Sequence, residues 1–303
     1  MVMNRISNSE VLFILNPNSG RKNTDSIIKE IRKIDPAVSL VITNDINDAE
    51  RVFAESIERF RVFVVVGGDG SVNEALKYLI NRPDKILAVY PTGSGNGFAF
   101  EQGFKRDVKS LIDDINRGET LSLDILEVNN YLCVNTSGIG FDSHVALAFS
   151  QTKKRGFWNY ALLSFRSVFT FKPFKARLLV RGVEHSGMYQ MITIANTRQF
   201  GNNAFIAPMA EPDDGFYEVV LIKPFPAYLY PAFVARVFIG NLRQSKYIEY
   251  IRTDETIIIE SDYKGLHVDG NPHIVDNQIN VSIRKSQLAV IRTKHRKKAE
   301  RGG

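Results

Sequence analysis

The chain has 303 residues, of which 44% are hydrophobic, 11% aromatic and 24% charged. This composition excludes a disordered or collagen-like chain, and the length suffices for one large domain or two ordinary ones, each with its own core. The net charge of +6 is concentrated after position 291, where six basic residues and one glutamate lie, so a uniformly basic nucleic-acid-binding surface is not expected.

The first 120 residues alternate short apolar runs with helix-like stretches. Strands are predicted at residues 11–15, 40–43, 62–66 and 86–90, and helices at residues 27–34, 48–60 and 73–80. Strands that are apolar on both faces and alternate with helices are typical of a parallel sheet covered by helices. Such folds bind their ligands at the carboxyl ends of the strands.

After about residue 121 the pattern changes to short β-rich runs separated by turn residues, which predicts a mainly antiparallel β domain. The runs lie at residues 123–128, 131–136, 176–183, 189–195, 217–222, 256–260 and 287–291, and helical stretches lie at 158–169 and 228–239. We therefore expect an α/β domain over residues 1–125, a β-rich domain over 126–290 and a basic tail over 291–303. The tail is predicted to be a mobile arm that is either simply solvated or attracted to an acidic membrane surface.

Membrane-spanning and secretory segments are not predicted. No apolar run reaches the roughly 18 residues that span a bilayer. The first ten residues, MVMNRISNSE, lack the apolar core of a signal peptide. A soluble, cytoplasmic protein is expected.

Three of the predicted strands in the first domain end in small, turn-forming residues: LNPNSG at 15–20, VGGDGSVNE at 66–74 and YPTGSGNGFA at 90–99. Glycine allows close approach of the backbone and positive φ angles, which expose N–H groups to phosphate, and a helix opening directly afterwards adds its positive end. Because parallel strands end at one edge of a sheet, the three turns are expected to form one site. The chain lacks the GxxxxGK[ST] segment of a P-loop and a clean GxGxxG dinucleotide motif.

Two acidic residues of the second turn are candidates for chemistry. Asp69 lies between Gly68 and Gly70. A carboxylate facing bound phosphate is unfavourable unless it holds a metal ion or accepts a proton, although Asp69 also suits a helix cap. Glu74 follows Ser71 by three residues, so it is interpreted either as a ligand contact or as part of a capping box.

The segment GGDGSVNEAL at residues 67–76 resembles the GGDGTxNE motif of the diacylglycerol kinase catalytic family, which also includes sphingosine and ceramide kinases and relatives of NAD kinase. Further matches follow in the family's order over nearly the whole chain: LNPNSGRK, PTGSGNGFA, SGIGFDS, KKRGFWNYAL, IANTRQFGNNAFIAPMAEPDDGFYEV and HVDGNP. The FGNNAFIAP…DDG segment and the late DG favour a lipid kinase over an NAD kinase. The resemblance implies an NAD-kinase-like parallel-sheet α/β domain followed by a mainly antiparallel β-sandwich.

The resemblance further implies that ATP lies at the carboxyl edge of the first domain's strands. The matching positions are Asn16, Pro17, Asn18, Ser19, Gly20, Thr43, Gly68, Asp69, Gly70, Ser71, Val72, Asn73, Glu74 and Ser94. Thr43, which ends the second predicted strand, is included because of the resemblance alone. The other positions belong to the turns already selected from the residues.

A lipid-binding region is implied in the second domain. Asp142 in GFDS matches an aspartate that recognises the lipid headgroup in sphingosine kinases, and its alternative is an ordinary turn aspartate. The aromatic stretch at residues 157–174 is flanked by basic residues, so it suits an acyl-chain pocket, a membrane contact or plain helix core. The basic cluster before it, Lys153, Lys154 and Arg155, resembles a family segment near the phosphates.

A structural Mg²⁺ is implied at the DDG turn, as in bacterial diacylglycerol kinases of this family. Its ligands would be the Asp214 side chain and backbone groups of Glu211 and Phe216. Oxygen ligands suit such a hard cation. A tight turn that needs Asp-Gly explains the same residues without a metal.

The main departure from the family lies in HVDGNP, where the family usually has DGE and its glutamate is the proposed general base. This chain has Asp269, Gly270 and Asn271, and an amide can orient a hydroxyl but cannot accept its proton at neutral pH. The predicted base is therefore Asp69, as in sphingosine kinases, with Asp269 as second choice. Without the usual base a weak kinase is expected, because general-base help is worth about 10²- to 10⁴-fold while positioning and charge neutralisation supply much of the rate of phosphoryl transfer.

Together these features predict an ATP- and Mg²⁺-dependent lipid kinase that acts on diacylglycerol or a related lipid, peripherally at the inner membrane face. Sphingoid bases or ceramide are the alternative acceptors, favoured by GSGN and GFDS. A second alternative, motivated by Asn271, is a nucleotide- or lipid-binding regulator without turnover. An NAD kinase ranks last because it leaves the aromatic stretch unexplained. The resemblance also makes a homodimer an expectation, and no nucleic-acid partner is predicted.

Overall fold

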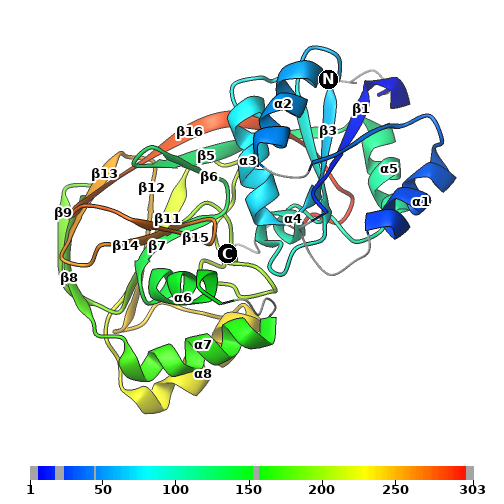
Figure 1. Ribbon diagram of the computed structural model, residues 1–303. Coiled ribbons are helices and arrows are strands. Elements are labelled where there is room, and N and C mark those ends of the chain that lie inside the picture. The colour runs from blue at the N-terminus through cyan, green and yellow to red at the C-terminus, as the bar shows by residue number, and fades with distance from the viewer. Residues whose placement is uncertain (1–5, 18–23, 44–45, 153–156, 298–303) are drawn as a thin grey trace. The chain divides into compact units, whose positions relative to one another are not determined.

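The computed structural model describes residues 6–17, 24–43, 46–152 and 157–297, which divide into two units (Figure 1). Among these residues, unit 1 comprises those up to Leu123 together with residues 286–297, and unit 2 comprises residues 124–285. The first boundary falls close to the predicted one at residue 125. The last apolar run was predicted to belong to the β domain, whereas residues 286–291 belong to unit 1.

Unit 1 alternates strands and helices as predicted. Its elements are η1 (Asn8–Glu10), β1 (Val11–Leu15), α1 (Thr24–Ile34), β2 (Ser39–Ile42), α2 (Ile46–Ser56), β3 (Val62–Gly67), α3 (Asp69–Leu79), β4 (Ile86–Pro91), α4 (Gly97–Glu101), α5 (Val108–Arg117), the start of β5 (Thr120–Val128) and the end of β16 (Gln278–Ile291).

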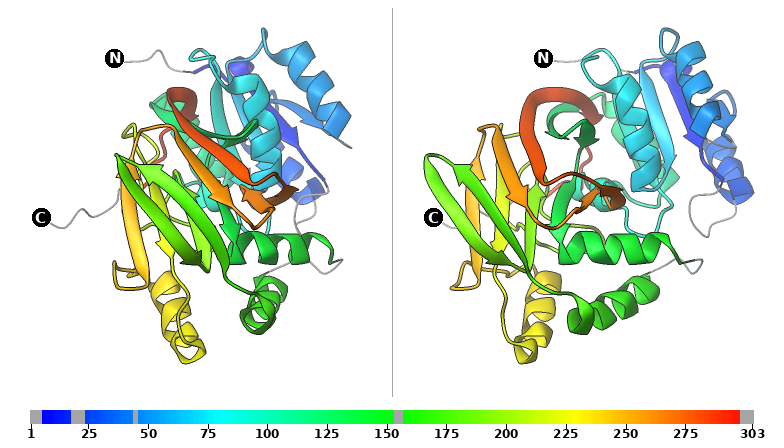
Figure 2. Two further views of the ribbon diagram at one scale, coloured as in Figure 1. Left: turned by 90° about the vertical axis from the view of Figure 1, so that its left-hand side faces the viewer. Right: turned by 60° about the vertical axis from the view of Figure 1, so that its left-hand side comes forward.

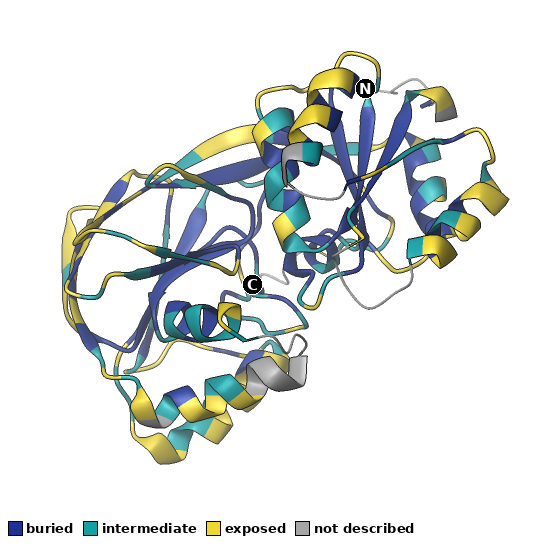
Figure 3. Ribbon diagram, in the orientation of Figure 1, coloured by how far each residue is buried: buried dark blue, intermediate teal, exposed yellow. Residues whose placement is uncertain are grey.

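The strands of unit 1 form a parallel sheet in the order β2-β1-β3-β4, which the end of β16 extends through the pairs Ala289–Ile86 and Val290–Leu87. Every residue of β1, β3 and β4 is buried (Figure 3), as expected of strands covered on both faces. Figure 1 shows α2 and α3 on one side of the sheet and α1 and α5 on the other. This is the three-layer α/β fold expected from the sequence.

Unit 2 is a β-sandwich with three helices. Its elements, besides parts of β5 and β16, are β6 (Tyr131–Cys133), β7 (Thr136–Gly140), α6 (Phe141–Ser150), α7 (Phe157–Thr170), β8 (Phe174–Val180), β9 (Val183–Tyr189), β10 (Met191–Ala195), β11 (Tyr217–Ile222), η2 (Ala227–Leu229), α8 (Tyr230–Ile239), β12 (Ile248–Thr253), β13 (Ile257–Ser261), β14 (Gly265–Val268) and β15 (Asn271–Ile274).

One sheet of unit 2 has the order β12-β11-β10-β7-β14-β15, and its pairs are antiparallel. The other brings together β9, β8, β13 and the first half of β16, with β5 and β6. Buried side chains from both sheets, among them Ile139, Leu178 and Val219, form one apolar cluster. A core enclosed between two sheets is what the sequence predicts for this part of the chain. Helices α6, α7 and α8 lie at one end of unit 2 (Figures 1 and 2).

The basic tail is held to unit 1 over its first residues. The Arg292 N–H donates to the Glu119 carbonyl oxygen at 2.8 Å, and the buried Thr293 hydroxyl donates to the Gln102 carbonyl oxygen at 2.7 Å. The mobile arm expected from Arg292 is therefore not found over residues 292–297, because these residues complete the edge of a folded unit. Residues 298–303 lie outside the described part of the chain.

No helix among the described residues combines the length and apolar composition needed to cross a bilayer.

Candidate active site

The three glycine-rich turns meet at one edge of the unit 1 sheet, as their places after parallel strands predict. The Asn16 N–H donates to the Val66 carbonyl oxygen at 3.2 Å, and the Thr92 N–H donates to the Gly67 carbonyl oxygen at 2.9 Å. The Asn16 side-chain amide also donates to the Ser71 hydroxyl at 3.1 Å. The first turn is thus bonded to the second, and the second to the third. Asn18, Ser19 and Gly20 lie outside the described residues.

The second and third turns touch through their backbones. A Cβ atom placed on Gly93 would lie 2.7 Å from the Gly68 Cα, and one placed on Gly68 would lie 3.1 Å from the Gly93 Cα. Glycine is required at these positions because of this close approach. The contact leaves two backbone segments with small side chains side by side, which is a suitable surface for a phosphate chain.

Replacing Gly93 with Ala is expected to lower the free energy of unfolding by about 1–3 kcal/mol, because a backbone contact of 2.7 Å cannot relax by side-chain rotation. Urea unfolding measures this effect. Gly70→Ala is the matched control, because a Cβ on Gly70 meets no atom within 4 Å. Equal stability of the two variants would show that the close approach of the turns does not constrain residue 93.

Asp69 connects the second turn to the third. It is the first residue of α3, and its two carboxylate oxygens accept the Gly97 N–H at 3.1 Å and the Phe98 N–H at 3.2 Å. Asp69 therefore caps α4, and not the helix that follows it in sequence. The two bonds fix the position of this carboxylate at the junction of the turns.

The capping-box interpretation of Glu74 is wrong, because α3 begins at Asp69 and Ser71 already lies inside its first turn. The residue before the helix, Gly68, makes no side-chain cap. Burial raises the pKa of the Glu74 carboxyl above its ordinary value, and the nearby Lys77 partly opposes this shift. Glu74 is thus a partly buried carboxyl group within α3.

The remaining predicted nucleotide contacts of unit 1 differ in exposure. Thr43 is buried, and both its N–H and its hydroxyl donate to the Leu15 carbonyl oxygen, which ties β2 to β1. Val72 is buried within α3, whereas Ser94 in the third turn is exposed. The others are exposed or half-buried at the same edge: Pro17, Gly68, Gly70, Ser71 and Asn73.

Asn96 is a candidate that the sequence analysis did not select. It has a φ of 50° and is 1% exposed, and its side-chain amide donates to the Gly93 carbonyl oxygen at 2.6 Å. Its side-chain oxygen has no hydrogen-bond partner among the described residues. A buried acceptor left open beside the glycine contact suits a ligand hydroxyl or amine. The GSGN segment was a readable signal, because asparagine readily adopts positive φ.

In unit 2, Asp142 belongs to a buried polar cluster at the start of α6. One carboxylate oxygen accepts the Ser143 N–H at 2.8 Å, and the other accepts the Thr193 hydroxyl and lies 3.1 Å from the His267 Nε2. Asp142 and His267 are 6% and 3% exposed, and the His267 Nδ1 has no partner among the described residues. Asp142 is therefore more than an ordinary turn aspartate, and His267 is a partner that sequence reasoning missed.

The late DG motif is a tight hairpin turn. Asp269 and Gly270 have φ angles of 48° and 80° between the paired strands β14 and β15, as a two-residue turn of the primed type requires. The buried Asp269 carboxylate accepts the N–H groups of Val134, Asn135 and Thr136 at 2.9–3.2 Å. Asp269 thus holds the link between β6 and β7.

Asn271 lies directly after this turn and is exposed at the start of β15. The thiol of Cys133 donates to Asp269, and burial together with the Asp269 charge raises the pKa of that thiol well above its ordinary value. Asp269 is therefore buried and bonded to backbone N–H groups, whereas Asn271 is exposed to solvent.

The DDG turn carries a guanidinium group where Mg²⁺ was expected. Asp214 accepts the Phe216 N–H at 3.0 Å, and its second oxygen lies 2.8 Å from Arg252, whose guanidinium also stacks over the Phe216 ring at 4.0 Å. Glu211 is buried nearby in the chain. The described residues contain no group of three His, Cys, Asp or Glu side chains that could hold a metal ion. Arg252 already supplies a positive charge to Asp214, so this ion pair disfavours a structural cation, and the Mg²⁺ site stays a prediction.

Chelation is accordingly expected to leave the melting temperature unchanged, whereas Arg252→Met should lower it, because Asp214 then loses its cation. Differential scanning fluorimetry with MgCl₂ or EDTA measures both effects. Arg177→Met is the control, because Arg177 makes only exposed ion pairs with Glu184 and Glu260, which contribute little. A fall of several degrees in the wild type on adding EDTA would restore the metal site.

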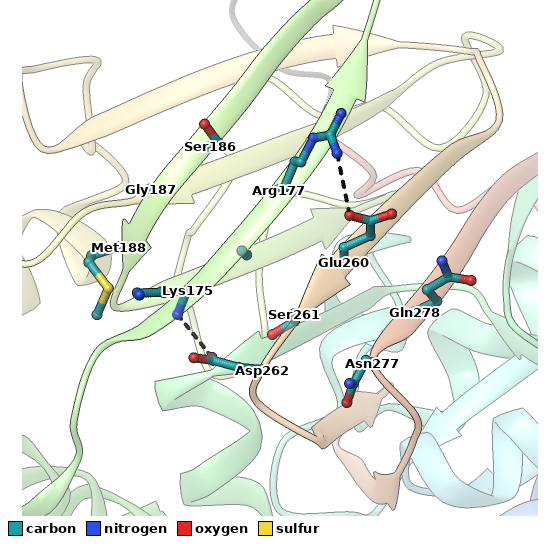
Figure 4. Close-up of a pocket in the computed structure, with 11 residues that line it drawn as sticks. Lys175, Arg177, Ser186, Gly187, Met188, Glu260, Ser261, Asp262, Asn277 and Gln278 are labelled. Carbon is teal, nitrogen blue, oxygen red and sulfur yellow. Dashed lines mark hydrogen bonds and ion pairs between the residues drawn. The ribbon is translucent and has the colours of Figure 1, made fainter.

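A surface cavity of about 610 Å³ lies over β8, β9 and β13 of unit 2 (Figure 4). Arg177 and Glu260 face one another across it at 3.8 Å, and the Lys175 N–H donates to Asp262 at 2.9 Å. None of the predicted site residues lines the cavity. Its charges are largely matched to one another, so it is not a candidate site.

Comparison with known proteins assigns both units. Residues 10–128 match the model of the diacylglycerol kinase catalytic domain, and residues 135–292 match the YegS C-terminal NAD kinase beta sandwich-like domain. The probable lipid kinase YegS-like of Shewanella frigidimarina is 26% identical over 84% of this chain and 86% of its own. The diacylglycerol kinase of Bacillus subtilis is 24% identical over 85% and 88%.

The fold has a solved counterpart. A crystal structure of a diacylglycerol kinase from Bacillus anthracis matches 94% of this chain and 97% of its own with a TM-score of 0.72 at 18% identity. The match to the second domain model alone covers more than half of the chain. The two matched domains follow one another along the chain in the same order as the two units. The chain therefore belongs to the diacylglycerol and lipid kinase family of phosphotransferases.

Proposed function

We propose that the protein transfers the γ-phosphate of MgATP to the free hydroxyl group of diacylglycerol or a closely related lipid, as a peripheral enzyme at the inner membrane face. The observation that carries this proposal is the junction of the three turns, where Gly68 meets Gly93 and Asp69 caps α4. Exposed backbone N–H groups and small side chains at the end of a parallel sheet suit the phosphates of a nucleotide.

The transfer needs little covalent help from the protein. The lipid hydroxyl oxygen bonds to the γ-phosphorus while the bond from that phosphorus to the bridging oxygen breaks, ADP leaves, and the hydroxyl proton passes to a base. Asp69 is the base that we propose, because its carboxylate lies at the turn junction, where the Gly97 and Phe98 N–H groups hold it in place. Asp269 is less suitable, because its carboxylate is buried and accepts three backbone N–H groups.

The acceptor is tested with purified full-length protein, MgCl₂ and labelled ATP. The panel contains diacylglycerol, monoacylglycerol, a sphingoid base, ceramide and NAD. Labelled phosphatidic acid as the main product supports the proposal. Preference for a sphingoid base or ceramide would contradict diacylglycerol as the proposed acceptor. Formation of NADP would contradict the proposal that the acceptor is a lipid.

A regulator without turnover is the second candidate, favoured by the exposed amide of Asn271 at the position where the resemblance implies a glutamate base. It predicts ATP binding without any labelled product. Asn271→Glu distinguishes the two cases, because a carboxylate restored at this position would give activity to a protein that lacks only its base. Activity in the wild type with no gain in Asn271→Glu would exclude the regulator.

A further inference from the structure

Arg106 is bonded to the backbone of the third glycine-rich turn. Its side chain is exposed, its Nε–H donates to the Pro91 carbonyl oxygen at 3.1 Å, and an Nη2–H donates to the Gly93 carbonyl oxygen at 3.1 Å. A guanidinium group holds its N–H donors in a rigid planar fork, so it can bind two neighbouring carbonyl oxygens at once. Both carbonyl groups therefore point toward the same side of the turn.

The chain on both sides of Arg106 is fixed. Phe104, two residues before it, is 3% exposed, and Asp107, directly after it, caps helix α5. The guanidinium carbon also lies 5.9 Å from the centre of the Phe100 ring, a contact that attracts a cation. Arg106 is thus held by its surroundings in the position from which it binds the turn.

The first peptide group bound by Arg106 shows on which side of the turn this arginine lies. In a trans peptide the C=O and N–H groups point in opposite directions. The N–H of this peptide group belongs to Thr92 and donates to the carbonyl oxygen of Gly67, the last residue of β3, at 2.9 Å. Arg106 therefore lies on one side of the third turn, and the second turn begins on the other side.

The second peptide group bound by Arg106 has the same direction. The Gly93 carbonyl oxygen accepts the Asn96 side-chain amide at 2.6 Å as well as Arg106. The N–H of that peptide group belongs to Ser94 and points the opposite way, toward the second turn, where Gly68 packs against Gly93. The positive end of this peptide group is thus directed at the junction of the turns, which suits a bound phosphate.

The positive charge of Arg106 adds to this effect. The second and third turns, residues 66–74 and 90–97, contain the acidic residues Asp69 and Glu74 and no lysine or arginine. A carboxylate near a bound triphosphate repels it. A cation bonded to a carbonyl oxygen polarises the peptide group and strengthens the positive end at its N–H. Arg106 therefore makes the turn a better site for phosphate from the side that faces away from the second turn.

We propose that Arg106 is a positioning residue for the nucleotide, which fixes the third turn so that the positive ends of its peptide groups face the phosphates of ATP. Arg106 acts through the turn and does not itself touch the ligand. The inference rests on the proposed kinase function, because it takes the junction of the turns as the ATP site. Its test measures binding of ATP and needs no turnover.

The test is calorimetric titration of the full-length protein with MgATP. Arg106→Met weakens ATP binding at least about tenfold, because two hydrogen bonds from a charged group are lost and the turn is no longer fixed. The salt dependence of ATP binding becomes shallower in this variant, since a positive charge near the phosphates is removed. In steady-state assays the KM for ATP rises, whereas the KM for the lipid stays unchanged.

Arg106→Lys is the milder variant. An ammonium group keeps the charge but lacks the fork that reaches both carbonyl oxygens, so its ATP affinity lies between those of the wild type and Arg106→Met. If Arg106→Met does not fold, this variant decides alone. A raised KM for ATP with an unchanged KM for the lipid supports the inference, and no change in either overturns it.

The matched control is Arg32→Met. Arg32 is also an exposed arginine of unit 1, and it donates to two backbone carbonyl oxygens, those of Pro36 at 2.7 Å and Val38 at 2.9 Å. These residues precede β2, at the end of the sheet opposite to the turns. The control thus removes the same charge and the same kind of bond, and it keeps the ATP affinity of the wild type.

Two results contradict the role of Arg106. Equal ATP affinity of the wild type and Arg106→Met, both shown by melting curves to be folded, overturns the inference. An equal loss of ATP affinity in Arg32→Met also overturns it, because the loss would then reflect the stability of unit 1 as a whole.

Failure of this inference and failure of the kinase are distinguishable. Weaker ATP binding in Arg106→Met, without phosphorylated lipid from the wild type, supports the role of Arg106 and contradicts the proposed activity. Phosphorylated lipid from the wild type and from Arg106→Met, with the same KM for ATP, contradicts the role of Arg106 alone. A wild type that does not bind ATP contradicts both.

Discussion

Substitution of Asp69 by Asn is expected to reduce phosphate transfer to lipid by at least about a hundredfold, because an amide cannot take the hydroxyl proton and general-base assistance is worth about 10²- to 10⁴-fold. The substitution also affects the turn junction, since the amide cannot accept both the Gly97 and the Phe98 N–H groups. The measurement is steady-state turnover of labelled ATP into phosphorylated lipid, together with ATP affinity by calorimetry. We expect kcat to fall more than the affinity.

The matched control for this variant is Asp107→Asn. Asp107 caps α5 by accepting the Ser110 N–H at 3.2 Å, in the same unit and without a predicted contact with ligand. Asparagine is as good a cap as aspartate, so this control should keep full activity. If Asp69→Asn and Asp107→Asn are equally active, Asp69 only caps α4 and the base lies elsewhere.

Replacement of Asp269 by Ala is expected to lower the free energy of unfolding by at least about 3 kcal/mol. Three N–H groups, from Val134, Asn135 and Thr136, lose their acceptor, and these residues are buried. Each buried donor left without a partner costs about 1–3 kcal/mol. Alanine also adopts the φ of 48° less readily than aspartate. Urea unfolding measures the loss.

Asp262→Ala is the comparison, because Asp262 is exposed and accepts one N–H group, that of Lys175. Its effect should stay below about 1 kcal/mol. A stable Asp269→Ala variant that has lost activity would contradict the structural role and point to Asp269 as the base. A destabilised variant that remains active at low temperature supports Asp69.

The position of the turn junction could be predicted because it depends on local patterns. β1, β3 and β4 are uninterrupted apolar runs, which only a parallel sheet covered on both faces accommodates, and parallel strands end at one edge. Small residues directly after such strands therefore meet. The two-residue turn at Asp269 and Gly270 was not predicted, because the HVDGNP segment was selected through the resemblance alone.

The partners of the acidic residues could not be predicted, because they depend on contacts between distant parts of the chain. Asp69 bonds to amides 28 and 29 residues further along, and the Asp269 carboxylate bonds to amides 133–135 residues before it. Neither distance leaves a periodic signal in the sequence. Arg252 opposite Asp214 is the same kind of contact, and it changes a predicted metal ligand into half of an ion pair.

Some elements were missed although the sequence carried their signals. Helix α5 begins after the cap Asp107 and ends at Arg117, before the cap Gly118, which has a φ of 67°. Both ends therefore had the residues expected of a helix. The helix α3 was predicted to start at residue 73, whereas it begins at Asp69. Gly68, which precedes the helix, packs on Gly93, whereas a Cβ on Gly70 inside the helix would meet no atom within 4 Å.

The closing strand of the unit 1 sheet has a consequence for biosynthesis. The edge of β4 is paired by Ala289 and Val290, about 200 residues further along the chain. At about 5–20 residues per second, a ribosome needs roughly 10–40 s to make that stretch, during which the apolar edge of β4 waits for its neighbour. Unit 1 is thus synthesised first but completed last. Until residues 289 and 290 have been made, the growing polypeptide is expected to need chaperones to protect the open edge of β4.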